Sequence, residues 1–322
     1  MNHYYLGIDI GGTKSAVIAG TDDMKILRKE GFATETHKGP GHTIGLLLNT
    51  ASEIAVSLGI DRLKAIGISC GGPLDSRKGI VQSPPNLPGW DDIPIVDLFR
   101  DKFRVPVYLQ NDANACALAE WKFGAGRGTQ NMVFLTFGTG MGAGLFIDGR
   151  LYSGTNDNAG EVGHIRLNDI GRVGYGKAGS FEGFCSGGGI AQLARIKTME
   201  KLQMGEKVSF CNSINELQEI TALKVAEAAN KGDSLAIEIY ELCGTYLGEG
   251  LSVIIDILNP ECIVIGSIFV RSGNLLIRSM EKAIEKESLS HARKVCRIVP
   301  AELEETIGDI ASLSVAADKA LN

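Results

Sequence analysis

The sequence lacks the features that mark membrane, secreted or nucleic-acid-binding proteins. No apolar run approaches the roughly 20 residues of a membrane-spanning helix. The amino terminus enters a strand-like pattern at once, with no basic segment, apolar segment and cleavage site, so we expect no signal peptide. No Lys or Arg cluster stands out, and the net charge of -6 opposes phosphate neutralisation. We therefore expect a cytoplasmic protein with no membrane and no nucleic-acid partner.

Disulfides are also not expected. The seven cysteines are odd in number and form no CxxC pair, which indicates free thiols in a reducing compartment. With 322 residues, 44% hydrophobic and 22% charged, the chain is an ordinary globular protein long enough for two domains. Glycine is in excess, at 41 copies, and gathers in a few loops. This clustering indicates sites built from backbone groups.

Apolar patterns and turn signals predict strands that alternate with helices, which is typical of an α/β protein. Asp233 is a predicted N-cap of a long helix that ends before Asn259-Pro260. The other predicted helices are Thr43–Leu58, Asp112–Phe123, Asn274–Lys286 and Gly308–Ala320. The predicted strands are Tyr4–Ile10, Lys14–Ala19, Ile26–Ala33, Leu63–Ser69, Val105–Gln110, Met132–Phe137, Ala143–Ile147, Cys262–Ile265 and Arg297–Pro300.

Two glycine-rich turns each connect a pair of predicted strands. Without a Cβ, glycine lets backbone N–H groups approach an anion closely, and Thr13 and Thr139 can add hydroxyl donors. Asp9, at the end of a buried strand, suits a hydrated Mg²⁺. Either turn alone could be a tight β-hairpin, and neither matches the Walker or dinucleotide motif. The pair, however, favours phosphate binding. The two segments are Asp9-Ile10-Gly11-Gly12-Thr13-Lys14 and Thr136-Phe137-Gly138-Thr139-Gly140-Met141-Gly142-Ala143-Gly144.

A polar pair, Asn111-Asp112, stands between a predicted strand and a predicted helix. In such a position Asp or Asn is most often an N-cap. The alternative is chemical: Asp112 could accept the proton of a substrate hydroxyl that attacks a γ-phosphoryl group, with Asn111 bonded to neighbouring hydroxyls. The two interpretations are compatible, because a helix start fixes a carboxylate rigidly.

Four motifs in order, DIGGTK, NDANACALAE, TFGTGMGAG and GEVGHI, resemble those of the ROK family of bacterial sugar kinases and sugar-responsive repressors. The resemblance runs from about Leu6 to Pro260. It implies an actin-like ATPase fold, with two ribonuclease-H-like domains around a cleft. We expect the first domain at residues 1–120, joined by a C-terminal helix at about 305–322, and the second at 121–304. The resemblance also implies a homodimer or homotetramer, and the sequence does not choose between them.

The resemblance assigns roles to individual residues. It places Glu161, His164 and Glu182 on sugar hydroxyls, which suits their hydrogen-bonding capacity, although a structural His and solvated Glu side chains are the alternatives. The full set of expected sugar-binding residues is Gly72, Asn86, Asn111, Asp112, Glu161, His164 and Glu182. The expected ATP- and phosphate-binding residues are Asp9, Gly11, Gly12, Thr13, Lys14, Thr136, Gly138, Thr139, Gly140 and Gly266.

Two departures from the family pattern matter. Many ROK members bind a structural zinc through one His and three Cys, but here the cysteine positions hold Val173, Tyr175 and Ser180. A tetrahedral zinc site needs four good ligands, so we expect no zinc and a loop held by packing of Val173, Tyr175 and Phe181. The second departure is the Gly266-Ser267-Ile268 turn, at a position where family members often have a run of glycines. The added bulk of Ser267 and Ile268 could change which phosphoryl donor the protein uses.

The resemblance therefore implies an ATP- and Mg²⁺-dependent, glucokinase-like sugar kinase acting on a hexose or N-acetylhexosamine, with Asp112 as general base. A DNA-binding repressor is not expected, because ROK repressors carry a helix-turn-helix domain ahead of this region and this chain starts at the first strand. A sugar-binding regulatory protein without kinase activity is the alternative. The identity of the sugar cannot be read from the sequence.

Overall fold

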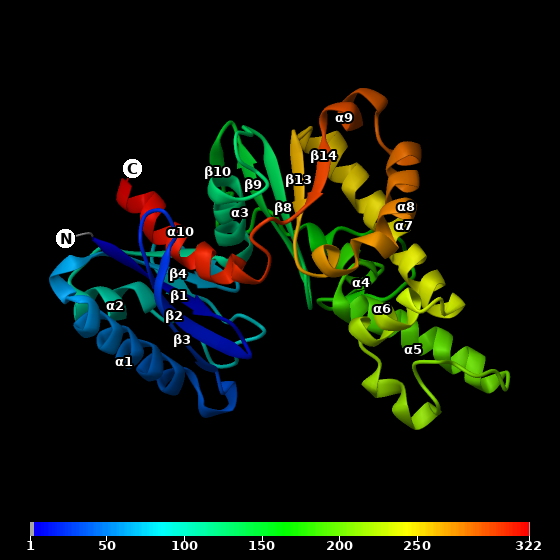
Figure 1. The fold of residues 1–322 in the computed structure, drawn as a ribbon, viewed down its shortest axis with the longest axis horizontal. Helices are drawn as coiled ribbons and strands as arrows, with labels where there is room; N and C mark the ends of the chain where they lie inside the picture. Colours follow the sequence, from blue (N-terminus) through cyan, green and yellow to red (C-terminus); the bar gives the residue numbers. More distant parts are fainter. Residues whose placement is uncertain (1–2, 322) are drawn as a thin grey trace. The chain divides into compact units, whose positions relative to one another are not determined.

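The computed structural model describes residues 3–321, and for residues 305 and 319–321 it describes the backbone alone. The chain divides into two compact units. Unit 1 comprises the chain up to Gly128, Gly144–Ala159 and the chain from Glu302 onward. Unit 2 comprises Thr129–Ala143 and Gly160–Ala301. Figure 1 shows the ribbon of the chain with most of its helices and strands labelled.

Unit 1 is built on a five-stranded sheet of order β3-β2-β1-β4-β7. Strands β1, β2 and β3 pair antiparallel, whereas β4 is parallel to β1 and β7 is parallel to β4. Strand β1 is apolar almost throughout because helices cover both faces of the sheet. The bounds are β1 (Tyr4–Ile10), β2 (Lys14–Gly20), β3 (Ile26–Ala33), β4 (Leu63–Cys70) and β7 (Val107–Asn111).

Alternate residues of β1 serve two separate cores. Leu6, Ile8 and Ile10 pack with residues of α1 (Pro40–Leu58) and α2 (Ile95–Phe103) on one face. Tyr5 packs with residues of α3 (Asp112–Phe123) and α10 (Ile307–Leu321) on the other. Helix α10, red in Figure 1, approaches so closely that only glycine fits beneath it at Gly7 and Gly67.

The second sheet has the order β10-β9-β8-β13-β14. Strands β8, β13 and β14 run parallel, and β13 is completely buried. The boundary between the units falls within β9, after Ala143. The bounds are β8 (Met132–Phe137), β9 (Met141–Ile147), β10 (Arg150–Tyr152), β13 (Cys262–Ile265) and β14 (Arg297–Pro300).

Two long helices form the largest helical layer of unit 2, α7 (Ser234–Leu258) and α8 (Ile268–Glu287). They pack closely because Gly244 and Gly248 of α7 have no side chain at the contact. A Cβ on either residue would collide with the backbone of α8. Asp233 caps α7, its side chain accepting the N–H of Ala236 at 2.9 Å. The other helices of this unit are α4 (Phe181–Phe184), α5 (Gly187–Gln203), α6 (Ala222–Asn230) and α9 (Ser290–Val295).

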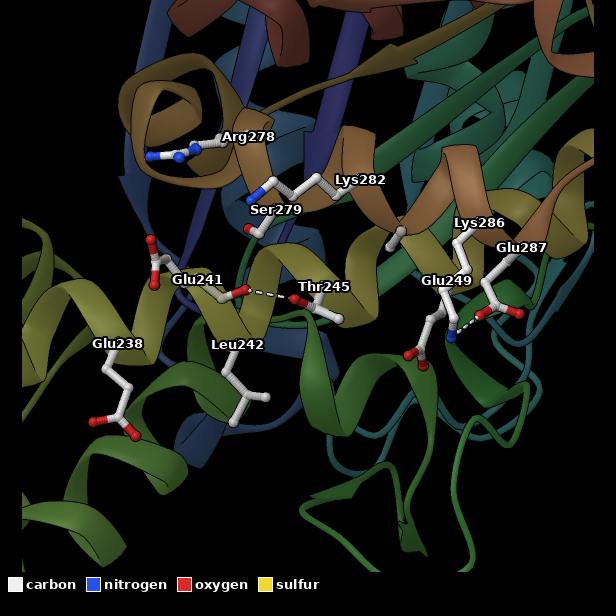
Figure 2. Close-up of a pocket in the computed structure, with 11 residues that line it drawn as sticks. Glu238, Glu241, Leu242, Thr245, Glu249, Arg278, Ser279, Lys282, Lys286 and Glu287 are labelled. Atoms are coloured by element: carbon white, nitrogen blue, oxygen red, sulfur yellow. Dashed lines mark hydrogen bonds and ion pairs between the residues drawn. The ribbon is translucent and has the colours of Figure 1, made fainter.

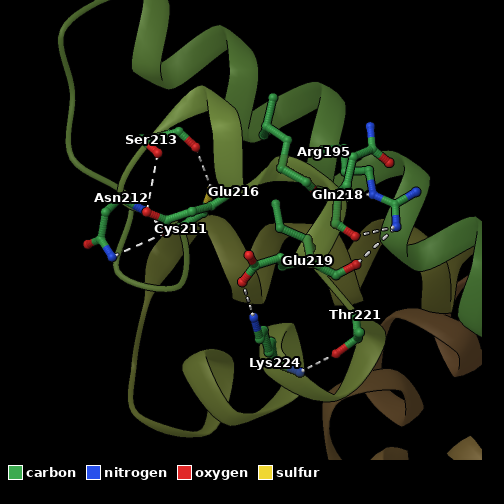
Figure 3. Close-up of polar contacts among 11 residues, drawn as sticks. Arg195, Cys211, Asn212, Ser213, Glu216, Gln218, Glu219, Thr221 and Lys224 are labelled. Atoms are coloured by element: carbon green, nitrogen blue, oxygen red, sulfur yellow. Dashed lines mark hydrogen bonds and ion pairs between the residues drawn. The ribbon is translucent and has the colours of Figure 1, made fainter.

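Polar contacts hold the segment between α5 and α6, shown in Figure 3. Arg195 of α5 donates to the backbone oxygens of Leu217 and Ile220 at 3.1 and 3.2 Å. Thr221 caps α6 by accepting the N–H of Lys224 at 3.2 Å. These bonds attach the segment to α5 and fix the start of α6. The segment contains the 3₁₀ helix η4 (Ile214–Glu219).

The remaining elements are short. Strand β5 (Leu74–Asp75) pairs with β6 (Ile80–Val81), and β11 (Val173–Gly174) pairs with β12 (Lys177–Ala178). The other 3₁₀ helices are η1 (Thr36–Lys38), η2 (Ile60–Arg62), η3 (Val162–His164) and η5 (Glu304–Thr306). All seven cysteines are free thiols. Within residues 3–321, none of the helices has the length and apolar character needed to span a bilayer.

Candidate functional site

The predicted catalytic residue lies at the start of α3, directly after β7. The N-cap is Asn111, whose side-chain oxygen accepts the N–H groups of Ala113 and Asn114 at 2.9 and 3.4 Å. Asp112 is the first residue of the helix, and its Oδ1 accepts the Ala113 N–H at 2.8 Å. The capping is thus done by Asn111. The second carboxylate oxygen of Asp112, Oδ2, has no hydrogen bond in the described chain. The N-cap interpretation therefore applies to Asn111 and leaves Asp112 available for chemistry.

Two carboxyl groups of unit 1 have raised pKa values. Asp112 is reachable by solvent, yet protein atoms crowd it, and this desolvation raises its pKa above the ordinary range. Burial also raises the pKa of Asp9 to about 7, and the charges of Asp112 and Asp309 contribute to the rise. Paired carboxyl groups with raised pKa values are more common at functional sites than elsewhere. The carboxylate of Asp9 also makes no hydrogen bond within the described chain, so its oxygens could accept water molecules of a hydrated cation.

The first glycine turn connects β1 and β2 and contacts the segment around Asn86. The turn closes through a bond from the Gly11 N–H to the Lys14 carbonyl at 3.1 Å. A Cβ on Gly12 would collide with the backbone of Asn86, so the two segments touch. Gly71 also faces the amide of Asn86, and a Cβ on Gly72 would lie 3.2 Å from Nδ2 of Asn111. Thr13 and Lys14 are exposed beside this turn. Unit 1 thus gathers all of its predicted residues near Asp112 or the first turn.

The second glycine turn, between β8 and β9, lies beside two helix N-termini of unit 2. The Gly187 N–H, in the first turn of α5, donates to the Gly138 carbonyl at 2.8 Å. Ser267, the N-cap of α8, has its hydroxyl 3.5 Å from the position of a Cβ on Gly138. Helix N-termini carry partial positive charge and free N–H groups, which favour anions. Thr139 is exposed at this turn, while the Thr136 hydroxyl is bonded to Gly142.

The three predicted sugar contacts of unit 2 lie around the same turn. Glu161 is the N-cap of η3 and His164 is its last residue, and both side chains are exposed. Glu182, on α4, accepts the Met141 N–H at 2.9 Å through Oε2. A Cβ on Gly163 of η3 would meet both the Met141 carbonyl and the Glu182 side chain. The structure therefore brings η3, α4 and the second glycine turn into contact.

Gly266 and Ser267 follow β13. Gly266 is buried, and a Cβ there would lie 3.2 Å from the ring of Phe134. Ser267 has φ 58° and ψ −110°, a backbone conformation that glycine adopts at less cost. Ile268 is buried, so its bulk points into the protein rather than toward solvent.

The prediction for the packing of the 161–185 loop was partly wrong. Val173 and Tyr175 are 48% and 65% exposed, because the β11–β12 hairpin turns their side chains outward. Phe181 is fully buried as predicted and packs its ring on Gly250 of α7. Among the residues that the structure describes, no group of three His, Cys, Asp or Glu side chains could hold a metal ion.

Residues that support the site were missed by the sequence analysis. Gln110 accepts the Asn111 N–H at 2.8 Å and the Asn114 side-chain amide at 3.1 Å. Asn114 also donates to the Ser153 hydroxyl at 3.4 Å. Both residues orient the start of α3, and their position on either side of Asn111-Asp112 was the available signal. The N-terminus of α5 was also missed, because Gly187-Gly188-Gly189 is typical of a loop.

Two recesses lie apart from the predicted residues, one within each unit. In unit 2 a recess between α7 and α8 presents Glu241 and Glu249 from one helix and Arg278 and Lys282 from the other, as Figure 2 shows. In unit 1 a recess of about 1220 Å³ is lined by β7, α3 and β10 residues such as Trp121. Neither contains any residue that the sequence predicts to bind sugar or phosphate.

The comparison with known proteins decides the family. The model of the ROK family matches residues 5–319. The chain belongs to the ROK family. A glucokinase from Halalkalibacterium halodurans is 31% identical to this ROK protein over 295 residues, which cover 89% of this chain and 87% of that one.

Solved structures of the family share the fold. A ROK family glucokinase from Streptomyces griseus, in complex with glucose and AMPPNP, has a TM-score of 0.77 at 25% identity, covering 98% of this chain and 99% of that one. A ROK family transcriptional regulator, described as a homologue of the E. coli MLC protein, has a TM-score of 0.86 at 25% identity, covering 100% of this chain and 79% of that one. The fold of this ROK protein is the actin-like ATPase fold, as expected. Both kinases and regulators are thus among its relatives.

Proposed function

We propose that this ROK protein is an ATP-dependent sugar kinase that phosphorylates a hexose or N-acetylhexosamine. The observation that carries the proposal is the carboxyl of Asp112, which is solvent-reachable, fixed at a helix start and raised in pKa. A raised pKa makes the carboxylate a better proton acceptor. Asp112 would accept the proton of the sugar hydroxyl as that oxygen attacks the γ-phosphoryl group of ATP.

The sugar would be held by side chains that suit hydroxyl groups. Asn111 keeps its Nδ2 donors free, since its oxygen is used for capping, so it would donate to the sugar. Its neighbour Gly72 supports this proposal because no side chain there blocks the amide. The remaining proposed sugar contacts are Asn86, Glu161, His164 and Glu182.

The phosphates would be held by backbone N–H groups of the two glycine turns. The N-termini of α5 and α8 beside Gly138 support this assignment, because they add partial positive charge. Asp9 fits a magnesium ion held through water, since its oxygens lack other partners and Mg²⁺ prefers a few carboxylates with retained waters. When bound there, Mg²⁺ would neutralise charge on the nucleotide phosphates. The other proposed phosphate contacts are Gly11, Gly12, Thr13, Lys14, Thr136, Thr139, Gly140 and Gly266.

The second candidate is a sugar-binding regulatory protein without kinase activity. Two observations favour it. The transcriptional regulator has the higher TM-score of the two crystal structures compared above, 0.86. Ser267 also holds a positive φ beside the proposed phosphate turn, where the sequence predicts an altered nucleotide contact. The two functions differ in one measurable property, the turnover of ATP in the presence of sugar.

The test is a coupled assay of ADP release with ATP and Mg²⁺ across a panel of hexoses and N-acetylhexosamines. We expect turnover on at least one sugar. Asp112→Asn should lower kcat by about 10²–10⁴-fold, which is the usual contribution of a general base, while sugar binding by calorimetry persists. The matched control is Asp101→Asn, an exposed aspartate on α2 of the same unit, which should leave kcat unchanged.

The outcomes separate the two candidates. Sugar binding without ADP release on every sugar, and without formation of sugar phosphate when polyphosphate replaces ATP, would support the regulatory protein and contradict the kinase. Turnover that survives Asp112→Asn would keep the kinase but remove Asp112 as its base.

A further inference from the structure

The loop that carries Glu182 contains a buried arginine with no carboxylate partner. Arg172 is 8% exposed, and its Nε donates to the carbonyl of Gly183 at 3.1 Å. Its Nη2 is buried and has no hydrogen bond among residues 3–321. Burying a guanidinium is costly unless other contacts compensate. An arginine in this position therefore requires compensating contacts that a leucine would not require.

Aromatic rings provide further contacts for the guanidinium. The guanidinium carbon lies 4.4 Å from the ring centroid of Phe184 and 5.7 Å from that of Tyr246. The two rings stack on each other, with centroids 3.7 Å apart and planes 13° from parallel. A cation over a desolvated aromatic face is more strongly attracted than one at the surface. We call these three side chains, Arg172, Phe184 and Tyr246, the Arg172 stack.

The Arg172 stack connects three segments of unit 2. Arg172 directly precedes β11, Phe184 ends α4, and Tyr246 lies on α7. The Arg172 carbonyl accepts the Gly179 N–H at 2.9 Å, which closes the β11–β12 hairpin. The hairpin is also bonded to α5, since Gln192 exchanges two hydrogen bonds with Val173 at 3.2 and 2.9 Å. The stack thus joins the hairpin to the four-residue helix α4 and to α7, while Gln192 joins the hairpin to α5.

Glu182 lies in the middle of that short helix. On one side of it, Phe181 is buried against Gly250 of α7. On the other, the Gly183 carbonyl and the Phe184 ring are held by Arg172. The Glu182 carboxylate then reaches Met141, at the end of the second glycine turn, at 2.9 Å. A four-residue helix has little stability of its own, so its orientation depends on these tertiary contacts.

We propose that Arg172 is a positioning residue that, through its stack on Phe184 and Tyr246 and its bond to Gly183, holds α4 so that Glu182 is pre-oriented for sugar. The expected effect on the sugar KM rests on the proposed kinase function. The expected effect on the orientation of α4 rests on geometry alone. When the stack is removed, α4 samples other orientations. Sugar binding must then select the competent one, and the apparent affinity falls by the fraction of protein that is competent.

The test compares Arg172→Met with Arg172→Lys. Methionine retains much of the apolar stem but loses the charge and the donor, whereas lysine retains a cation over the Phe184 ring. We expect Arg172→Met to raise the sugar KM about tenfold or more, with kcat at saturating sugar within about threefold of the wild type. Arg172→Lys should recover part of the loss. The matched control is Arg166→Met, an exposed arginine of the same loop that donates to the Ala178 carbonyl at 2.7 Å. It should change KM less than twofold.

A second measurement needs no enzymatic activity. Amide hydrogen exchange of residues 171–184 should quicken in Arg172→Met and stay near wild type in Arg166→Met. If neither exchange nor KM changes in Arg172→Met, the proposal is wrong. If exchange quickens while KM stays constant, Arg172 is a structural residue only, which also overturns it. A wild-type protein without turnover would refute the kinase, and the exchange experiment would still decide whether Arg172 holds α4. If Arg172→Met does not fold, Arg172→Lys provides both measurements.

Discussion

The contact of α10 with the sheet of unit 1 gives a sharp test of the fold. Gly67, on β4, lies directly beneath the helix. A Cβ there would lie well under 3.0 Å from the Ser312 carbonyl oxygen and the Ala316 nitrogen, and 3.0 Å from the Val315 Cβ. Ordinary contacts of a Cβ begin near 3.4 Å, so α10 would have to retreat by about an ångström. Backbone atoms cannot move aside as a flexible side chain does.

The magnitude follows from two opposing effects. Overpacking of a core costs about 1–3 kcal/mol, and we expect the upper end because Gly7 constrains the same helix from the neighbouring strand. Replacing a strand glycine gains up to about 1 kcal/mol from lost unfolded-state freedom. The net loss for Gly67→Ala is then about 2 kcal/mol. At about 2–4 °C per kcal/mol, thermal unfolding should begin about 4–8 °C lower.

The assay is thermal unfolding followed by circular dichroism, with Gly45→Ala as the matched control. Gly45 lies within α1, and a Cβ there would meet no atom within 4 Å. Alanine is the better helix former by about 1 kcal/mol, so the control should unfold at the same or a higher temperature. If Gly67→Ala unfolds at the wild-type temperature, α10 does not pack against β4 as closely as the structure indicates.

Two further predictions concern charge and metal. The pKa of Asp9 is raised from 3.8 to about 7 by burial, so the folded protein retains a proton that the unfolded chain releases. The stability that this proton contributes is complete below about pH 4 and is lost as the pH rises through 7. In metal-free buffer, Asp9→Asn should therefore raise the Tm at pH 8 and leave it unchanged near pH 4; an equal pH dependence in both proteins would refute the shift. Chelation of the purified protein should leave its Tm unchanged, because no cluster of three ligands exists among the described residues, and finding one zinc per chain would contradict this.

Much of the sheet architecture could be predicted because several strands, such as β1 and β8, are nearly continuous apolar runs between turn signals. The predicted bounds of Tyr4–Ile10, Ile26–Ala33 and Met132–Phe137 are those observed for β1, β3 and β8. Strands β1 and β8 are almost wholly buried, so local composition and tertiary environment agree, whereas β3 is a mostly exposed edge strand. The cap at Asp233 was predictable for a similar reason, since the side chain and the helix start are neighbours in sequence.

Helices with misleading glycines could not be predicted. α5 begins with three glycines and was not predicted, although Ser186 caps it by accepting the Gly189 N–H at 3.0 Å. α8 was predicted from Asn274 but begins at Ile268. Its chain is kinked at Ser272, with φ −134° and ψ 18°, and the sequence signal detects only the part after this kink. In both cases tertiary packing outweighs local propensity.

The candidate site also has parts that the sequence predicts and parts that it does not. Residue types and their order pointed to Asp112, and the structure adds that Asn111 is the residue that caps α3. The direction of side chains in the 161–185 loop could not be read from composition, because a two-residue hairpin strand can turn either face outward. Val173 and Tyr175 were therefore predicted to hold the loop by packing, although both are exposed. No prediction was made for Arg172, whose burial depends on contacts with Phe184 and Tyr246 from elsewhere in the chain.

The 161–185 loop is held by the Arg172 stack, which is made of side chains and involves no metal ion, and this affects how the loop responds to pH and to metal supply. A metal site of His and Cys requires deprotonated ligands, so its occupancy depends on pH and on the supply of metal. Burial lowers the pKa of the Arg172 guanidinium, but arginine is the side chain least prone to deprotonation. An Arg172 stack on Phe184 and Tyr246 therefore keeps its charge throughout the physiological range and needs nothing from solution. By this reasoning the orientation of Glu182 should respond to substitution within the stack, and neither to a chelator nor to pH between 6 and 9.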